Sequence, residues 1–224
     1  LGMHAAQHVR RQVSQQLGAG RRAILVVDDT QLLALGRQPQ HGAREVAAAC
    51  RIDPARAQDQ VVAAAGADGL LAFGGDLSPQ RLLNAYRHGI FPWFSDGEPI
   101  LWWSPSRRAV FRTDGVHLSS RFRRGLRTSR LLVRADTAFD AVIGACAHNP
   151  RPGQSGGTWI TRGMIQAYAR LHRLGHAHSI EVFDGDDLVG GLYGLAIGRM
   201  FCGESMFSAQ SGASTVALAA LARR

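Results

Sequence analysis

The 224-residue sequence contains no lysine, so all 26 of its Lys-or-Arg positions are arginine. Its three cysteines, Cys50, Cys146 and Cys202, are far apart and odd in number, which argues against both a disulfide framework and a zinc site. The sequence also lacks a long apolar run and a basic start followed by an apolar segment, so neither a membrane span nor a signal peptide is predicted. We therefore expect a cytoplasmic protein in a reducing compartment, with no bound metal or cofactor and no membrane contact.

Positive charge is concentrated in one part of the sequence, whose formal net charge is +9. Residues 101–134 hold nine arginines and one acidic residue, whereas residues 135–224 hold equal numbers of the two. A basic segment of this kind is typical of a polyanion-binding surface, and the alternative is a solvated basic face. Four of its arginines fall in a predicted helix: Arg121, Arg123, Arg124 and Arg127.

Two apolar runs on either side of a glycine-containing turn predict a β-hairpin over residues 190–208. Glu204 lies in the second strand, and strict alternation would place it on one face with Cys202 and Met206. A buried carboxylate is costly unless it has a partner, and such groups are common in functional sites. Glu204 is therefore a candidate for acid–base chemistry, and the alternative is a structural acid that pairs with an arginine or caps the next helix.

The remaining pattern predicts helices mixed with antiparallel strands, and so an α+β fold class. Ser78, Asp136 and Thr161 are each expected to cap a helix. The predicted helices cover residues 79–88, 119–128, 137–147, 162–174 and 213–222, and further strands cover 107–111 and 178–183.

The tryptophans divide into two predicted groups. Trp102 and Trp103 lie in an apolar run and are expected in a core. Trp93 follows Pro92 in a non-helical turn, and this position predicts a surface platform on which a base or another ring could stack.

Several blocks, taken in order, are shared with one known family: GIFPWF, ILWWSP, GTWIT, AYxRLHxLGHAHSIEV, LVGGLYG and FCGESMFS. Over residues 68–218 the chain closely resembles the bacterial leucyl/phenylalanyl-tRNA–protein transferases. The resemblance implies an enzyme, an aminoacyltransferase that moves leucine or phenylalanine from charged tRNA to the N-terminal Arg or Lys of an acceptor protein. That transfer marks the acceptor for degradation by the N-end rule. We expect the enzyme to be a monomer.

The resemblance also implies a division into regions. Residues 1–64 form an atypical N-terminal extension, expected to be disordered or misassigned. Residues 65–134 form a small N-terminal α+β domain with a basic tRNA-binding surface. Residues 135–224 form a domain like that of the GCN5-type N-acetyltransferases, which is incomplete.

Site roles follow from the same resemblance. Glu204 is expected to orient the attacking amine or to take its proton. Trp93 and Trp159 correspond to the tryptophans that hold the 3′-terminal adenosine. The four arginines of the predicted helix would hold the tRNA through its phosphates. Positions that line the pocket for the leucyl or phenylalanyl side chain are matched by Leu192, Met206, Ser208 and Leu218.

The sequence departs from the family in two places. Residues 213–215 read Ala-Ser-Thr where the family usually has Ala-Ser-Lys, so one positive charge is missing. The family's Ile-Asp-Cys-Gln strand, which supplies two residues of its proposed catalytic relay, would lie beyond Arg224. We therefore expect a truncated chain that transfers little on its own, with a non-catalytic tRNA-binding remnant as the alternative. An acyl-CoA N-acetyltransferase is disfavoured, because residues 208–214 lack the glycine-rich turn that would cradle a pyrophosphate.

Overall fold

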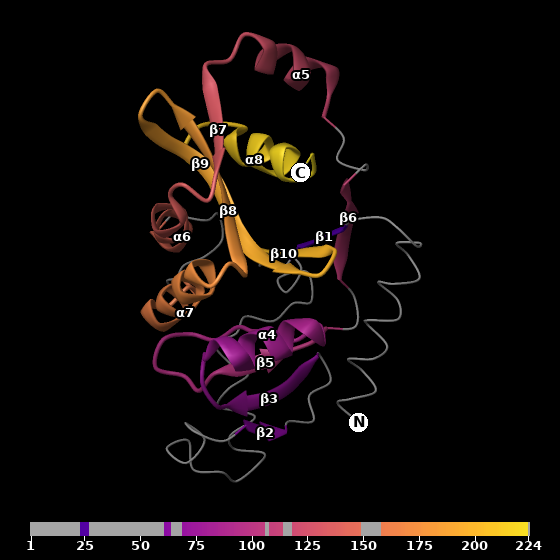
Figure 1. Cartoon of the computed structure of the whole chain (residues 1–224), viewed down its shortest axis with the longest axis vertical. Coiled ribbons are helices and arrows are strands. Elements are labelled where there is room, and N and C mark those ends of the chain that lie inside the picture. Colours follow the sequence, from indigo (N-terminus) through magenta and orange to yellow (C-terminus); the bar gives the residue numbers. More distant parts are fainter. Residues whose placement is uncertain are drawn as a thin grey trace. The chain divides into compact units, whose positions relative to one another are not determined.

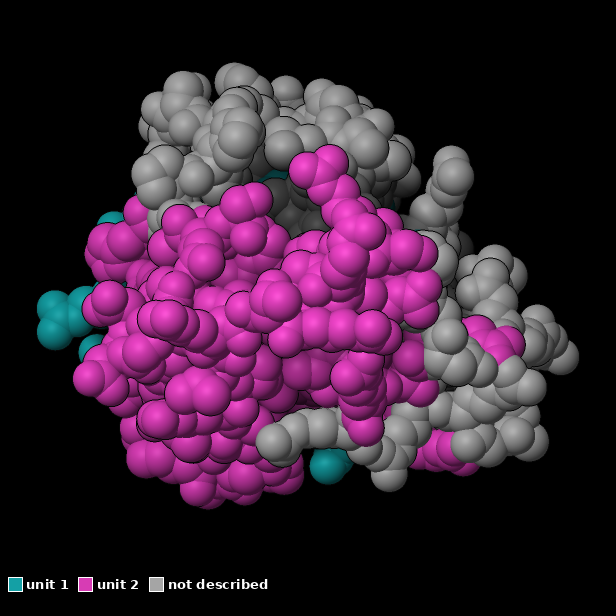
Figure 2. All heavy atoms as spheres, turned by 90° about the horizontal axis from the view of Figure 1, so that it is seen from above, with its two compact units in different colours: residues 1–19, 28–108, 157–167 teal, residues 20–27, 109–156, 168–224 magenta. Residues whose placement is uncertain are grey.

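The structure, a computed structural model, describes residues 23–26, 61–63, 69–105, 108–113, 118–148 and 158–223. The chain divides into two compact units (Figure 2). Unit 1 comprises residues 1–19, 28–108 and 157–167, and unit 2 comprises residues 20–27, 109–156 and 168–224.

Unit 1 contains an antiparallel sheet in the order β2-β3-β5-β4. Its strands are β2 (Val61–Ala63), β3 (Leu70–Gly74), β4 (Phe91–Pro92) and β5 (Leu101–Trp103). Helix α4 (Pro79–Arg87) lies beside this sheet (Figure 1) and begins as predicted, because the Ser78 Oγ accepts a hydrogen bond from the Arg81 N–H. The Asp76 carboxylate accepts from Arg81 Nη2 at 2.9 Å and from the Ser78 N–H at 2.8 Å. These bonds, with Arg81 the larger cause, hold the pKa of Asp76 well below its usual range.

The predicted core positions of Trp102 and Trp103 are confirmed, since both side chains are buried. Trp102 Nε1 donates to the Gly74 carbonyl at 2.9 Å, and Trp103 Nε1 donates to the Trp93 carbonyl at 2.8 Å. Each indole therefore contributes apolar area to the core of unit 1 while its N–H stays paired.

Unit 2 contains a six-stranded sheet in the order β6-β1-β10-β9-β8-β7 (Figure 1). Its strands are β1 (Ala23–Val26), β6 (Ala109–Arg112), β7 (Leu131–Ala135), β8 (Ala177–Asp184), β9 (Asp187–Ile197) and β10 (Met200–Ser208). The β9–β10 pair is the predicted hairpin, and Gly198 turns it with a φ of 61°. Within the sheet, β1 runs parallel to β10 while the other pairs are antiparallel. The α+β prediction is confirmed.

Helices cover both faces of the unit 2 sheet. Gly190 and Gly191 are consecutive in β9 and therefore face opposite sides. A Cβ at Gly190 would collide with Ala213 of α8 (Ala213–Leu221), whereas one at Gly191 would stand 3.2 Å from Val142 of α6 (Phe139–His148). The glycines thus let both helices approach the sheet, and we call the two sides the α8 face and the α6 face.

Two further helices complete the described chain. Helix α5 (Ser120–Arg127) begins at Ser119, whose Oγ accepts from the Phe122 N–H at 3.2 Å. Helix α7 (Arg162–Arg173) begins at the predicted cap, Thr161, whose Oγ1 accepts from the Met164 N–H at 3.3 Å. The boundary between the two units falls within α7, after residue 167.

The prediction that Asp136 caps a helix over residues 137–147 is wrong. Helix α6 begins at Phe139, and Asp136 has a φ of 58°, in the left-handed region that Asp tolerates better than most residues. Its carboxylate binds β8 instead, because the Ser179 N–H donates to Oδ1 at 2.9 Å.

The predicted regions differ from the compact units. Seven residues of the expected extension, 23–26 and 61–63, lie in strands, and the rest of 1–64 is outside the described residues. The units divide after residue 108 and not at the predicted boundary after residue 134, so α5 belongs to unit 2.

Candidate functional site

Glu204 lies at a β-bulge in β10. The pairing with β9 is regular up to Gly203, shifts register, and resumes at Ser205. The Glu204 side chain is 1% exposed, and its Oε2 accepts a hydrogen bond from the Tyr168 hydroxyl at 3.1 Å. Tyr168, on α7, also packs edge-to-face against Tyr193, with ring centroids 5.7 Å apart. The carboxylate is therefore buried and fixed by a donor from the helix beside it.

The predicted face of Glu204 is wrong, and the bulge is the reason. Met206 packs into the apolar cluster of the α8 face. Tyr193 alternates with Leu192 of that cluster and so lies on the α6 face, together with Tyr168 and the oxygen of Glu204 that it holds. The additional residue at the bulge reverses the phase of the strand, so Met206 does not share the face of Glu204.

Three of the four predicted pocket residues come together. Leu192 is a buried member of the α8-face cluster, and Met206 and Leu218 are half-buried against it. Leu192 and Met206 are direct cross-strand partners. The fourth, Ser208, stands at the end of β10, where its Oγ donates to the Gln210 carbonyl at 2.7 Å and accepts from the Ser214 N–H of α8.

A cavity of about 390 Å³ borders this cluster. Phe122 and Leu126 of α5 and Val216 of α8 form apolar parts of its lining, and each also belongs to the cluster or packs against it. Arg121 and Gln210 add polar groups. Its size and mixed lining are those of a small-ligand site.

The four predicted tRNA-binding arginines share one exposed helix. Arg121, Arg123, Arg124 and Arg127 are all exposed on α5, while Phe122 and Leu126 turn toward the α8-face cluster. Within the described part of the chain no acidic side chain forms an ion pair with these arginines. Helix α5 therefore presents a positive surface that is not neutralised by its described neighbours.

Both predicted substrate tryptophans belong to unit 1. The prediction that Trp93 forms a surface platform is wrong, because its side chain is 6% exposed and packs edge-to-face on Trp103, with centroids 5.8 Å apart. Trp159 is similarly buried, at 7% exposed. Among the described residues, neither indole N–H has a hydrogen-bond partner.

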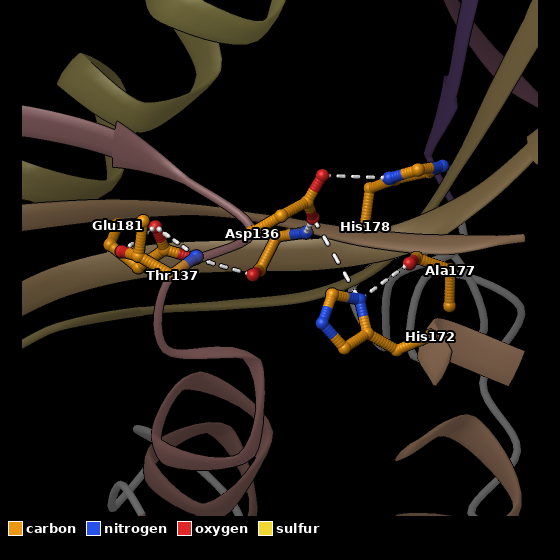
Figure 3. Close-up of polar contacts among 7 residues, drawn as sticks. Asp136, Thr137, His172, Ala177, His178 and Glu181 are labelled. Carbon is orange, nitrogen blue, oxygen red and sulfur yellow. Dashed lines mark hydrogen bonds and ion pairs between the residues drawn. The ribbon is translucent and has the colours of Figure 1, made fainter. Parts of the chain in front are cut away.

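A polar network that was not predicted from the sequence lies at the start of β8 (Figure 3). The Asp136 Oδ2 accepts a hydrogen bond from His178 Nδ1 at 2.9 Å. Glu181, which is fully buried, accepts from the Ser179 hydroxyl and from the Thr137 Oγ1, the latter at 2.9 Å. The alternation of His178, Ile180 and Val182 along a predicted strand could have placed the histidine on the cluster face, but nothing in the sequence indicates its pairing with Asp136.

The described residues contain neither a metal-binding cluster nor a membrane-spanning helix. No three or more His, Cys, Asp or Glu side chains are grouped so as to hold a metal ion in the described ranges. In the same ranges, the helices are too short or too polar to cross a membrane.

Two family models and relatives from several bacteria match the chain. The family model described as leucyl/phenylalanyl-tRNA protein transferase matches residues 110–224, and the model of the corresponding N-terminal domain matches residues 75–106. A leucyl/phenylalanyl-tRNA–protein transferase of Xanthomonas oryzae pv. oryzae is 77% identical over 155 residues, which is 69% of this chain and 62% of the relative. Similar proteins of the same name come from Xanthomonas campestris pv. campestris, at 71% identity, and Xylella fastidiosa, at 68%; they are matched over 70% and 69% of this chain and 63% of their own lengths.

Proposed function

Because the chain belongs to the leucyl/phenylalanyl-tRNA–protein transferase family, we propose that it transfers leucine or phenylalanine from charged tRNA to the α-amine of an acceptor protein. The acceptor would begin with Arg or Lys, and the transfer would mark it for N-end-rule degradation. The chain spans 62% of the length of the Xanthomonas oryzae relative. The mostly antiparallel sheet of unit 2, with helices on both faces, supports the further proposal that this unit is an N-acetyltransferase-like domain.

The observation that carries the proposal is the α8-face cluster. Leu192 and Met206 face each other across β9 and β10, and Leu218 of α8 packs against them. We propose that these residues, together with Ser208 at the rim, receive the leucyl or phenylalanyl side chain. A pocket for both a branched and an aromatic side chain needs adaptable walls, and the flexible thioether of Met206 supplies one. The adjoining cavity leaves room for a substrate group.

Little chemistry is needed beyond alignment and one proton transfer. An aminoacyl-tRNA is an activated ester, and an α-amine with a pKa near 8 is roughly a tenth deprotonated at neutral pH. We propose that Glu204 assists by orienting the amine or by taking its proton. The bond from Tyr168 supports this role, since it fixes one carboxylate oxygen.

Contacts with the tRNA are proposed for both units. The arginines of α5 would neutralise backbone phosphates without reading sequence. Trp93 and Trp159 would hold the 3′-terminal adenosine, and the buried N–H of each supports this proposal. A buried donor without an acceptor is costly, and a nucleotide acceptor would relieve that cost.

The direct test is transfer of radiolabelled leucine from leucyl-tRNA to a peptide with N-terminal Arg. A peptide that differs only in an N-terminal Ala is the matched control. The assay has two arms, the chain itself and the chain joined to the part of the Xanthomonas oryzae relative that the match does not cover. Incorporation into the Arg peptide but not into the Ala peptide, in either arm, supports the proposal. Absence of incorporation in both arms contradicts it.

A non-catalytic tRNA-binding role is the second candidate. It is favoured by the exposed arginines of α5, which do not depend on Glu204 to bind a polyanion. This alternative predicts salt-sensitive tRNA binding with no transfer in either arm.

A further inference from the structure

We propose that His178, oriented by Asp136, is the base that takes the proton from the attacking α-amine. The inference rests on the proposed function and adds to it a residue outside the predicted site. It depends on three features of unit 2: the hydrogen bonds of Asp136, the face on which His178 lies, and the distance from that histidine to the proposed side-chain pocket.

Asp136 determines which nitrogen of His178 carries the proton. Its Oδ2 lies 2.9 Å from His178 Nδ1, and because a carboxylate accepts hydrogen bonds, Nδ1 is the donor. In the neutral ring Nε2 then carries the lone pair. Figure 3 shows this nitrogen at the far end of the ring, directed away from Asp136. An imidazole held by a carboxylate through one nitrogen, with the other available, has the arrangement of a general base.

Asp136 is itself held in place from several sides. Its Oδ1 accepts from the Ser179 N–H at 2.9 Å, and its own N–H donates to the Ser179 carbonyl at 3.1 Å. Its φ of 58° lies in a region that non-glycine residues seldom occupy. Backbone conformations of this kind persist where the surroundings over-determine them, and they are frequent at functional sites. The carboxylate is thus presented to His178 by a rigid turn.

His178 lies on the face that carries the proposed pocket. Residues 178, 180 and 182 alternate along regular β8, and Ile180 and Val182 belong to the α8-face cluster. Ile180 pairs with Leu192, which pairs with Met206, whereas the row that contains His178 continues through Gly194 and Gly203. The two rows are two residues apart, roughly 7 Å along the strands.

Backbone and an aromatic ring stand close beside the His178 row, because a Cβ on Gly194 would meet the Cys202 carbonyl oxygen and the Phe201 ring. The neighbours of His178 across the sheet are glycines, so no side chain of β9 or β10 projects from those two positions. The Phe201 ring reaches to 2.6 Å from where a Cβ on Gly194 would stand, and it packs against the cluster. An aromatic edge therefore borders the space beside the histidine, while the His178 side chain is 36% exposed and remains accessible.

The proposed step balances in atoms and protons. The neutral amine nitrogen attacks the carbonyl carbon of the ester, and a C–N bond forms. Nε2 of His178 takes one proton from that nitrogen. The C–O bond to the tRNA 3′ oxygen then breaks, and the proton passes from Nε2 to the leaving oxygen, which departs as a hydroxyl group. The products are an amide and uncharged tRNA, and His178 returns to its initial state.

Glu204 is placed differently from His178. It is 1% exposed, and its Oε2 is bound to Tyr168 on the α6 face. A buried carboxylate in that position can act through its charge, whereas the exposed imidazole on the α8 face can reach a solvent-borne amine. Of the two roles proposed for Glu204, the orienting role then remains and is exerted through its charge, whereas His178 takes the proton.

The decisive variant is His178→Asn, because the Asn amide can keep the Nδ1-like hydrogen bond to Asp136 but has no equivalent of Nε2. His148→Asn is the matched control. His148 is exposed at the end of α6, and its Nδ1 donates to the Gly144 carbonyl at 2.8 Å. Leucine transfer is measured for both variants in the arm that transfers.

We expect His178→Asn to lower kcat about 100-fold or more while KM for the Arg peptide is unchanged, and His148→Asn to retain the wild-type kcat. A wild-type kcat for His178→Asn overturns the role of His178 and leaves the transfer function standing. Absence of transfer by the unaltered protein in both arms overturns the function and this role together.

A second measurement does not depend on the folding of a variant. In the unaltered protein labelled with ¹⁵N-histidine, a non-hydrolysable phenylalanyl-adenosine amide and an Arg-terminated peptide are added together. We expect the Nε2 resonance of His178 to shift and that of His148 to stay. An unshifted His178 resonance, when the ligands are shown to be bound, overturns the proposal.

Discussion

The double substitution Arg123→Ala/Arg127→Ala tests the basic helix quantitatively. The two arginines are four residues apart on α5, so they project from the same side of the helix, and both are exposed. Alanine preserves helix propensity, so the fold of unit 2 should be retained. If each guanidinium neutralises one phosphate, the substitution removes two counterion-release terms from tRNA binding.

The expected size follows from that count. Each phosphate contact contributes about 0.7 to 0.9 to the slope of log K against log salt, so the slope should flatten by roughly 1.4 to 1.8. Between 50 and 200 mM salt the wild-type protein should then lose about 7- to 12-fold more affinity than the variant. Filter binding or fluorescence anisotropy with leucyl-tRNA at several salt concentrations measures both slopes.

A charge-matched control distinguishes a local contact between α5 and tRNA from an effect of the protein's net charge. Arg170 and Arg173 are exposed on α7, and Arg170→Ala/Arg173→Ala removes the same charge from a different surface. This variant should keep the wild-type slope. Equal flattening in the two double variants, or an unchanged slope in the α5 variant, would refute a specific tRNA surface on α5.

Three further predictions concern stability. Tyr168→Phe removes a donor from the buried carboxylate of Glu204, so the free energy of unfolding in urea should fall by about 1 to 3 kcal/mol, and a wild-type value would contradict the assigned bond. Gly190→Ala forces a methyl group against Ala213 and should lower the free energy of unfolding by about 1 to 3 kcal/mol in the same assay. An unchanged free energy of unfolding would show that α8 moves away to make room for the methyl group. Asp76 has a lowered pKa, so it stabilises the fold fully above the unfolded pKa near 3.9 and loses this effect as pH falls through the lower folded value. Asp76→Asn should therefore be less stable than wild type at pH 7, and the difference in the free energy of unfolding should begin to narrow as pH falls below about 4. A difference that stays constant with pH would contradict the linkage.

Local chemistry made much of the fold predictable. The caps at Ser78 and Thr161, the hairpin turn at Gly198 and the core tryptophans all follow from short-range signals that the structure confirms. Such features depend on residues close in sequence or on burial that the residue type itself favours.

The wrong predictions concern features that depend on residues distant in sequence or on an irregularity in strand pairing. Asp136 has the side chain of a helix cap, but the Ser179 N–H, 43 residues away in sequence, competes successfully for its carboxylate. The face of Met206 depends on a bulge at Glu204 that alternation alone cannot reveal. Trp93 is buried because Trp103 packs on it, a contact that the preceding proline does not predict.

The most direct test of the account is a single-turnover transfer experiment with radiolabelled leucyl-tRNA, comparing the unaltered protein with Glu204→Gln. Gln retains the shape of the side chain and an oxygen that can accept from Tyr168, but it removes the charge. In the arm that transfers, we expect leucine incorporation into an Arg-terminated acceptor when Glu204 is intact, and a lower rate with little change in tRNA affinity for Glu204→Gln. Equal rates for the two proteins, or weaker tRNA binding as the sole effect, would contradict the assignment of Glu204 to the reaction.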